Sequence, residues 1–147
     1  MPFLSYDGLM EIAPMREEAG WWIEDAKRCL EKAEKYSDLG FYEDTVFNCQ
    51  QALEKLFKGL WIVLLKKRPI KTHKITALYK PLEKIIQLED ELKDFLSLIS
   101  PYYFITRYPD IAMGLPGEII TKSFASECLT KTRRIFECSL GIISKEK

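Results

Sequence analysis

Residues 42–66, YEDTVFNCQQALEKLFKGLWIVLLK, determine how this chain folds. Apolar residues recur along this stretch in alternating steps of three and four, the spacing of one face of an α-helix, at Val46, Cys49, Leu53, Leu56, Leu60 and Val63. Further large apolar residues widen that face beyond a single stripe, namely Phe47, Phe57, Trp61 and Leu64. Because such a helix must be covered on more than one side, we expect it to occupy the centre of a helical bundle.

Helical spacing of apolar residues continues on both sides of this central segment. The helix before it should end near Gly40, because glycine readily adopts the left-handed conformation that follows a last helical turn. The segment after the basic turn at residues 66–74 contains Pro81, which removes a backbone donor, so we expect a kink or a break there. Four helices are therefore predicted beside the central one, at residues 17–36, 75–86, 90–100 and 121–144.

The remaining stretch, residues 102–118, shows no lasting period and carries two prolines and two glycines. We interpret it as a long ordered loop, and loops of this length in compact domains often have a functional role. The predicted fold class is all-α, an up-and-down bundle of about five helices with a long loop before the last helix. One domain is expected at residues 20–147, preceded by an N-terminal extension at residues 1–19.

Charge is balanced across the chain, with 22 Lys plus Arg against 22 Asp plus Glu. No long-range field is therefore available to collect nucleic acid or to coat an acidic membrane surface. Lysines in the basic turn at residues 66–74 complement the C-terminus of the preceding helix, and the turn contains no Phe, Tyr or Trp on which a base could stack. We therefore do not expect RNA as a partner.

The four cysteines lie far apart, each inside a predicted helix, at Cys29, Cys49, Cys128 and Cys138. Metal sites usually need clustered ligands, so neither a metal nor another cofactor is expected. Nothing at the start resembles a secretory leader, which predicts a cytoplasmic, reducing location with free, buried and inert thiols. The longest strongly apolar stretch, residues 59–65, is far shorter than the roughly 20 residues that a membrane-spanning helix needs.

Four features, taken together, resemble one family. They are Trp22 with Ala26 in the first helix, QALEKxxK at residues 51–58 in the second, Thr72-His73-Lys74 before the third, and Arg107-Tyr108-Pro109 in the loop. In this order and spacing they are similar to a HEPN domain, a helical module often encoded beside a minimal nucleotidyltransferase. The resemblance extends over about residues 20–144, nearly the whole chain.

The resemblance implies two branches of function. Some HEPN domains resemble ribonuclease toxins, in which an arginine followed four to six residues later by a histidine forms a composite site across a homodimer. Others are non-catalytic partners associated with binding a nucleotide or with helping a nucleotidyltransferase to hold its substrate.

The catalytic pattern is absent around Arg107. Its histidine would have to stand at residues 112–114, which are Ala, Met and Gly, and no tyrosine occupies residues 114–116, where modified toxins carry their target. The single histidine, His73, lies upstream of Arg107. We expect it to form a hydrogen bond with backbone or solvent near a helix start, although folding or dimerisation could bring it near Arg107. No catalytic residue is assigned, and the balance is against an enzyme.

Arg107 is nevertheless the main candidate for binding an anion, because a guanidinium beside Tyr108 can bind a phosphate or a carboxylate through two parallel hydrogen bonds. The alternative is an ion pair with Asp110 or with Glu54 that pins the loop to the bundle.

The second helix carries a polar face on which Glu54 and Lys58 are spaced to pair at i, i+4. This face is either solvated or lines a cleft with Arg107 that receives a nucleotide, a role suggested mainly by the resemblance. The candidate ligand-binding residues are therefore Arg107, Tyr108, Lys55, Lys58, Gln51, Glu54 and His73.

Surplus apolar surface usually marks an interface, and the chain has many large apolar residues for its size, including Trp21 beside Trp22 and Phe57 beside Leu60 and Trp61. A two-fold homodimer is predicted. The preferred function is a non-catalytic, homodimeric HEPN-type binding module that partners a nucleotidyltransferase-like protein and binds a nucleotide. The alternatives are a metal-independent endoribonuclease toxin of a toxin–antitoxin pair and a purely structural dimerisation bundle.

Overall fold

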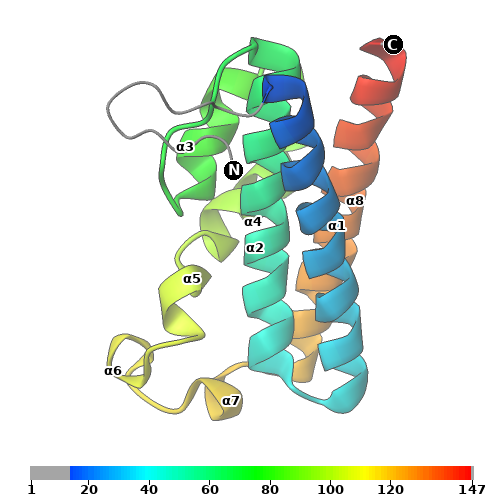
Figure 1. Ribbon diagram of the computed structural model, residues 1–147. Coiled ribbons are helices and arrows are strands. Elements are labelled where there is room, and N and C mark those ends of the chain that lie inside the picture. The colour runs from blue at the N-terminus through cyan, green and yellow to red at the C-terminus, as the bar shows by residue number, and fades with distance from the viewer. Residues whose placement is uncertain (1–13, 147) are drawn as a thin grey trace.

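The computed structural model describes residues 14–146, whose regular structure consists of helices joined by turns, without β-strands. Figure 1 shows the long helices side by side, with the shorter ones on one flank and below. The α-helices are α1 (Met15–Leu39), α2 (Tyr42–Leu60), α3 (Ile75–Tyr79), α4 (Asp90–Ile99), α5 (Tyr102–Ile105), α6 (Pro109–Ala112), α7 (Pro116–Ile119) and α8 (Lys122–Glu146). The predicted all-α bundle is confirmed. The predicted extension, residues 1–19, lies mostly outside the described residues.

A tight turn at Gly40 makes α1 and α2 an antiparallel pair. Gly40 has φ 83°, and its backbone N–H donates to the oxygen of Ser37 at 3.1 Å, while that of Phe41 donates to Tyr36 at 2.9 Å. These bonds satisfy the last carbonyl groups of α1, and glycine adopts the left-handed conformation at no steric cost. The predicted end of the first helix is therefore confirmed.

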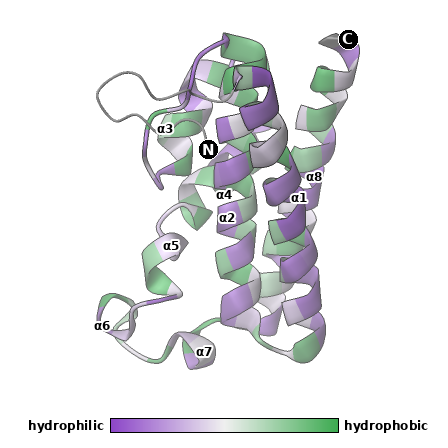
Figure 2. Cartoon of the chain, viewed as in Figure 1, coloured by the Kyte–Doolittle hydropathy of each residue, from purple (hydrophilic) through white to green (hydrophobic). Residues whose placement is uncertain are grey.

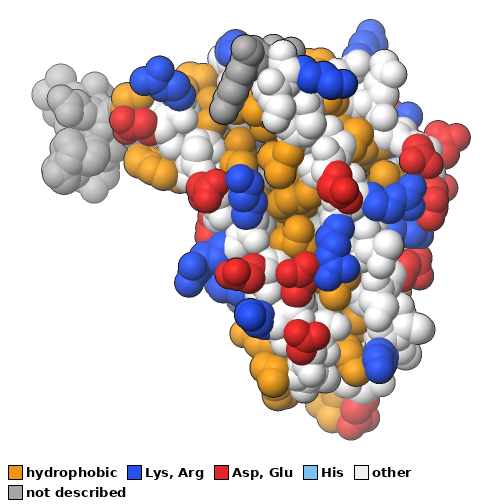
Figure 3. Space-filling model, turned by 90° about the vertical axis from the view of Figure 1, so that its right-hand side faces the viewer, with side chains coloured by type: hydrophobic (Ala, Val, Ile, Leu, Met, Phe, Trp, Pro, Cys, Tyr) orange, Lys and Arg blue, Asp and Glu red, His pale blue; other side chains and the backbone are white. Residues whose placement is uncertain are grey.

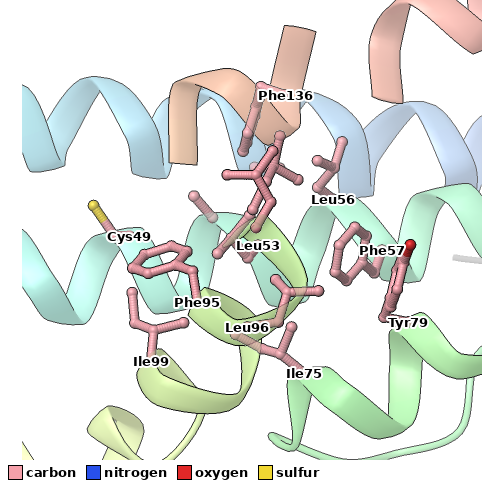
Figure 4. Close-up of a cluster of buried hydrophobic side chains, with 14 of the residues drawn as sticks. Cys49, Leu53, Leu56, Phe57, Ile75, Tyr79, Phe95, Leu96, Ile99 and Phe136 are labelled. Carbon is pink, nitrogen blue, oxygen red and sulfur yellow. The ribbon is translucent and has the colours of Figure 1, made fainter. Parts of the chain in front are cut away.

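The central position of α2 is also confirmed. Nearly all of its residues from Thr45 to Leu60 are buried, and α1, α3, α5 and α8 all contact it. Figure 4 shows Leu53, Leu56 and Phe57 of α2 meeting side chains from the neighbouring helices. The helix continues through a π-helical turn, Trp61–Leu65, and ends at Lys66, which has φ 59°.

Close packing of α1 against α2 depends on small residues. Ala19, Ala26 and Ala33 of α1 are buried, and Gly59 of α2 lies against the first of them. A Cβ atom on Gly59 would lie 2.6 Å from Cγ1 of Ile23 and 3.3 Å from the backbone oxygen of Ala19. The second contact is with backbone, so only a shift of α1 can relieve it.

We expect Gly59→Ala to lower the free energy of unfolding by about 1 kcal/mol. The gain in helix propensity, about 1 kcal/mol, is outweighed by an overpacking cost of about 1–3 kcal/mol. The matched control is Gly20→Ala in α1, where a Cβ atom meets nothing within 4 Å and the same gain should appear unopposed. Urea unfolding of the two variants measures the difference. Equal stabilisation by both would show that the helices have room at Gly59.

Pro81 breaks the third helix as predicted. Helix α3 ends at Tyr79 and a 3-10 turn, η2 (Lys80–Leu82), follows. Thr72 does not cap this helix, because its Oγ1 accepts from the N–H of Lys74 at 3.0 Å, inside the turn before it. The N–H of Ile75 donates instead to Oγ of Ser100, also at 3.0 Å, which ties the start of α3 to the end of α4.

The long ordered loop predicted at residues 102–118 contains short helices that the sequence did not reveal. This segment forms three helical turns, α5, α6 and α7, and no residue of these turns is buried. Pro109 and Pro116 stand at the first helical positions of α6 and α7, where the missing N–H costs nothing. The sequence shows no helical spacing of apolar residues here because each turn has only four residues, too few for such a spacing to repeat.

All four cysteines are free, and Cys29, Cys49 and Cys128 are buried as predicted, whereas Cys138 is only partly buried. Burial raises the pKa of the Cys49 thiol to about 12 and that of Cys128 still further, so neither ionises near neutral pH. Within residues 14–146 no group of acidic, histidine and cysteine side chains could hold a metal ion. No helix in that range has both the length and the apolar character needed to cross a membrane.

Candidate functional site

The polar face of α2 points partly into the protein. Glu54 is 4% exposed and Lys58 is 9% exposed, so the alternative of a solvated face does not hold for these two residues. Nζ of Lys58 lies 3.0 Å from Oε2 of Glu54 and 5.2 Å from the centre of the Trp22 ring. A buried carboxylate is tolerated only when it is paired and hydrogen-bonded. Glu54 therefore has to be the centre of a network.

Four donors surround the carboxylate of Glu54. Besides Lys58, they are Nε2 of Gln50 at 3.4 Å, Nε2 of Gln51 at 3.3 Å and Nδ1 of His73 at 3.2 Å. Nε2 of Gln50 also donates to the backbone oxygen of His73 at 3.0 Å, which fixes the turn before α3 against α2. The expected bond of His73 to backbone or solvent is wrong for Nδ1, because its partner is the Glu54 side chain.

The imidazole of His73 is held from a second direction by an aromatic ring. It stacks on Tyr103 of α5, with ring centres 3.8 Å apart and an angle of 12° between the planes. Phe104 meets the same imidazole edge-on at 6.4 Å. Tyr103 in turn packs against Phe47 of α2, with ring centres 5.9 Å apart. These contacts fix the plane of the imidazole, and a proton on Nδ1 would leave Nε2 as the acceptor.

Arg107 lies on the same aromatic group. Its guanidinium carbon is 5.2 Å from the ring centres of Phe47 and Tyr103 and 5.8 Å from that of Tyr108, all within the range of a cation–π contact. The expected ion pair with Asp110 or Glu54 is not present among the described residues. Folding thus brings His73 and Arg107 to one shared ring, Tyr103.

A cleft of 730 Å³ opens beside this group, between the start of α3 and the end of α4. Its walls are mostly apolar and also carry several hydroxyl groups and one lysine. They are formed by Thr72, His73, Lys74, Thr76, Ser97, Ser100, Pro101 and Phe104. We call His73, Tyr103, Arg107 and this cleft the candidate site.

One residue predicted for the site lies elsewhere. Lys55 points toward α1, where its Nζ is 2.6 Å from Oδ2 of Asp25. Burial alone would lower the pKa of Lys55, but the hydrogen bond and the charge of Asp25 outweigh it, so the pKa is raised. Gln51 and Glu54 belong to the network under the site, and Tyr108 contacts Arg107 at its outer edge.

Three residues important to the site are not among those that the sequence singles out for it. Phe47 and Tyr103 supply the aromatic surface, and Gln50 anchors the turn that carries His73. The run Tyr102-Tyr103-Phe104 was a visible signal, because three consecutive aromatic residues offer more ring surface than packing at the base of one loop requires.

Comparison with known proteins places the chain among similar helical proteins. The HEPN domain family matches residues 19–143. MJ1304, a candidate toxin of Methanocaldococcus jannaschii, is 25% identical over 82% of this chain and 90% of that protein. The crystal structure of TT1696 from Thermus thermophilus aligns with a TM-score of 0.75 and 28% identity, over 85% of this chain and 98% of that one. ST0689, an archaeal HEPN homologue, aligns with a TM-score of 0.70 and 29% identity, over 85% and 97%.

Proposed function

The chain belongs to the HEPN domain family, and on that premise we propose that it is a homodimeric binding module that holds a nucleotide and does no chemistry alone. The observation that carries this proposal is the shared position of His73 and Arg107 on the ring of Tyr103, beside the cleft. A guanidinium without a carboxylate partner in the described residues is suited to a phosphate group. The aromatic side chains and hydroxyl groups nearby suit a base and a sugar.

The absence of a histidine at residues 112–114 supports the non-catalytic branch of the family. The face of the molecule drawn in Figure 3 offers no continuous basic track for a long polyanion. Figure 3 shows Lys and Arg side chains interspersed with Asp and Glu on the face formed mainly by α1 and α8, without a continuous basic stripe. A small anion can still be recognised by a local group such as Arg107, because direct hydrogen bonds need no long-range field.

Calorimetric titration with ATP and GTP tests the ligand. We expect one binding event per chain, and Arg107→Ala should weaken it about 10- to 100-fold, since a hydrogen bond to a charged group contributes about 1.5–3 kcal/mol. Arg28→Ala, at an exposed arginine of α1, is the matched control and should bind like wild type. If wild-type protein gives no heat with either nucleotide at millimolar concentration, the nucleotide proposal fails.

A nucleotidyltransferase-like protein is the proposed partner, on the ground of family membership. Affinity purification of the tagged chain from its native host, followed by mass spectrometry, tests this. Recovery of a nucleotidyltransferase in a fixed ratio to the chain supports the partnership. If the chain is recovered alone, as a dimer that binds no nucleotide, the remaining function is that of a purely structural dimerisation bundle.

An endoribonuclease toxin is the second candidate function, and one observation favours it. Glu54 holds Nδ1 of His73 at 3.2 Å, which is how a carboxylate orients an imidazole that transfers protons through Nε2. MJ1304, a relative, is named as a candidate toxin. The test is RNA cleavage by the purified protein. If wild type cleaves RNA and both His73→Gln and Arg107→Ala abolish the cleavage, the proposed function changes from binding module to ribonuclease.

A further inference from the structure

One ring nitrogen of His73 is left for a ligand by the contacts within residues 14–146. The imidazole lines the cleft, and its side chain is 48% exposed. The hydrogen bonds of this ring in the described part of the chain are all made by Nδ1, to the two carboxylate oxygens of Glu54 at 3.2 and 3.3 Å. Nε2 of His73 therefore remains available at the cleft.

The partner of Nδ1 determines which ring nitrogen carries the proton. Glu54 is a carboxylate paired with Lys58 at 3.0 Å, and a carboxylate accepts hydrogen bonds but donates none. Nδ1 must therefore donate, so a neutral imidazole has its lone pair on Nε2. Glu54 is buried, so water does not compete for its bond with Nδ1. The ring consequently presents a hydrogen-bond acceptor to the cleft.

Three contacts fix the direction of this acceptor. Tyr103 stacks on the imidazole of His73 at 3.8 Å, with 12° between the planes, and Phe104 meets the edge of the imidazole at 6.4 Å. The backbone oxygen of His73 accepts from the side-chain amide of Gln50 at 3.0 Å, so the turn itself is held. A rigid acceptor loses little freedom on binding, and it favours a ligand that places a donor opposite it.

The sugar is the part of the proposed nucleotide that lies opposite this acceptor. The guanidinium carbon of Arg107 is 5.2 Å from the centre of the Tyr103 ring on which the imidazole stacks, so a phosphate on Arg107 is less than one nucleotide length from His73. The cleft beyond the imidazole is apolar enough for a base. Figure 2 shows hydrophobic residues on α5, which contributes Phe104 to the cleft wall. A sugar that joins the two groups has to pass His73.

The 2′-hydroxyl is the sugar donor nearest to the base, because it is on the carbon next to the one that carries the base. With the base in the cleft, this hydroxyl faces the wall to which His73 belongs. We infer that Nε2 of His73 accepts a hydrogen bond from the ribose 2′-hydroxyl, so that the site selects ribonucleotides over deoxyribonucleotides. This rests on the nucleotide of the proposed function and adds which class of nucleotide is bound.

Calorimetric titration of the full chain with ATP, 2′-deoxy-ATP and 2′-deoxy-2′-fluoro-ATP tests the inference. The fluorine analogue keeps the pucker of ribose but has no proton to donate. Wild type should bind ATP about 3- to 10-fold more tightly than either analogue, the range for one neutral hydrogen bond. The preference is not larger because water can bind to the half-exposed imidazole in place of the hydroxyl. Equal affinity for ATP and the fluorine analogue overturns the inference while the nucleotide proposal stands, and no binding of any of the three overturns both.

Two substitutions show whether His73 is responsible for the preference. His73→Asn keeps an N–H group near the position of Nδ1 for Glu54 and removes Nε2, so it should bind ATP and the fluorine analogue equally. Arg107→Lys is the matched control, because a weaker phosphate contact should reduce both affinities by the same factor. A preference for ATP that survives in His73→Asn would show that another group recognises the hydroxyl, and the inference would fail.

Nitrogen NMR of untagged wild type at mildly alkaline pH gives a second reading that needs no substitution, should the asparagine variant fail to fold. The chain has a single histidine, so the signals of its imidazole nitrogens are unambiguous. The free protein should carry the proton on Nδ1, and the Nε2 signal should shift with ATP but not with the fluorine analogue. A proton on Nε2 in the free protein, or equal shifts with both nucleotides, contradicts the inference.

Discussion

Replacement of Glu54 by alanine should lower the free energy of unfolding by about 3–5 kcal/mol, the largest loss expected from a polar substitution in this chain. The carboxylate neutralises Lys58, whose side chain is only 11% exposed, and accepts from two glutamines and His73. Without it, the ammonium group remains buried without a counter-charge, and breaking a buried pair from one side costs about this much. Urea unfolding followed by circular dichroism measures the loss.

Two further variants separate this explanation from a general intolerance of Glu→Ala changes. Glu24→Ala removes an exposed carboxylate that pairs with Lys27 at 3.1 Å, and it should change stability by less than about 0.5 kcal/mol. The double variant Glu54→Leu, Lys58→Met replaces the buried pair by apolar side chains of similar volume, so it should recover most of the loss. If the double variant is as unstable as Glu54→Ala, the unpaired ammonium is not the cause.

The central role of Glu54 also explains which parts of the site were predictable. An i, i+4 pair of Glu54 and Lys58 could be read from the sequence, but its burial could not, because the same spacing is typical of solvent-facing helices. Burial is set by what covers the helix, here the turn carrying His73 on one side and Trp22 on the other. Both covering elements are distant in sequence, and local periodicity contains no information about them.

The same limitation affected the predicted interface. The expectation of surplus apolar surface named Trp21 beside Trp22, and Trp21 is exposed, but it also named Phe57, Leu60 and Trp61, whose side chains are all buried. Trp61 even donates from Nε1 to the backbone oxygen of Leu78 at 2.7 Å, deep between α2 and α3. A helix that is apolar on all sides indicates burial within the chain, whereas half of the large apolar residues exposed in the described part of the chain lie at residues 102–119, where no period is visible.

Helix positions, by contrast, followed from the sequence with small errors. The stripes of α1, α2, α4 and α8 are long enough for a spacing of three and four to be distinct, and Gly40 and Pro101 mark the ends of α1 and α4. The sequence predicts the start of the last helix at Thr121, and Oγ1 of this residue accepts from the N–H of Phe124 at 3.1 Å, a normal N-cap bond. Residues three or four positions apart are enough to predict a helix. The site cannot be predicted in this way, because its residues are much farther apart in the sequence.

Phe57 packs α3 against α2, and its replacement by alanine should lower the free energy of unfolding by about 3–5 kcal/mol. The ring is fully buried and packs on Tyr79 of α3, with ring centres 5.6 Å apart. Tyr79 in turn donates from its hydroxyl to the backbone oxygen of Ile86 at 2.6 Å and accepts from the N–H of Leu88 at 3.2 Å. Figure 4 shows the two rings lying against each other between α2 and α3. The cavity left by alanine would remove the apolar contact that holds this whole segment on α2.

The matched control is Phe41→Ala, because Phe41 is 51% exposed and touches mainly the edge of Tyr36, with ring centres 6.5 Å apart. Its loss should cost less than about 1 kcal/mol, since little surface is buried there. Thermal unfolding distinguishes the two variants, and comparable losses would mean that α3 can collapse into the space at Phe57.

Nucleotide titration of the Phe57→Ala protein under folding conditions adds a second criterion. His73 is anchored to α2 by Glu54 and Gln50 and not by Phe57, so the fraction that remains folded should keep its affinity.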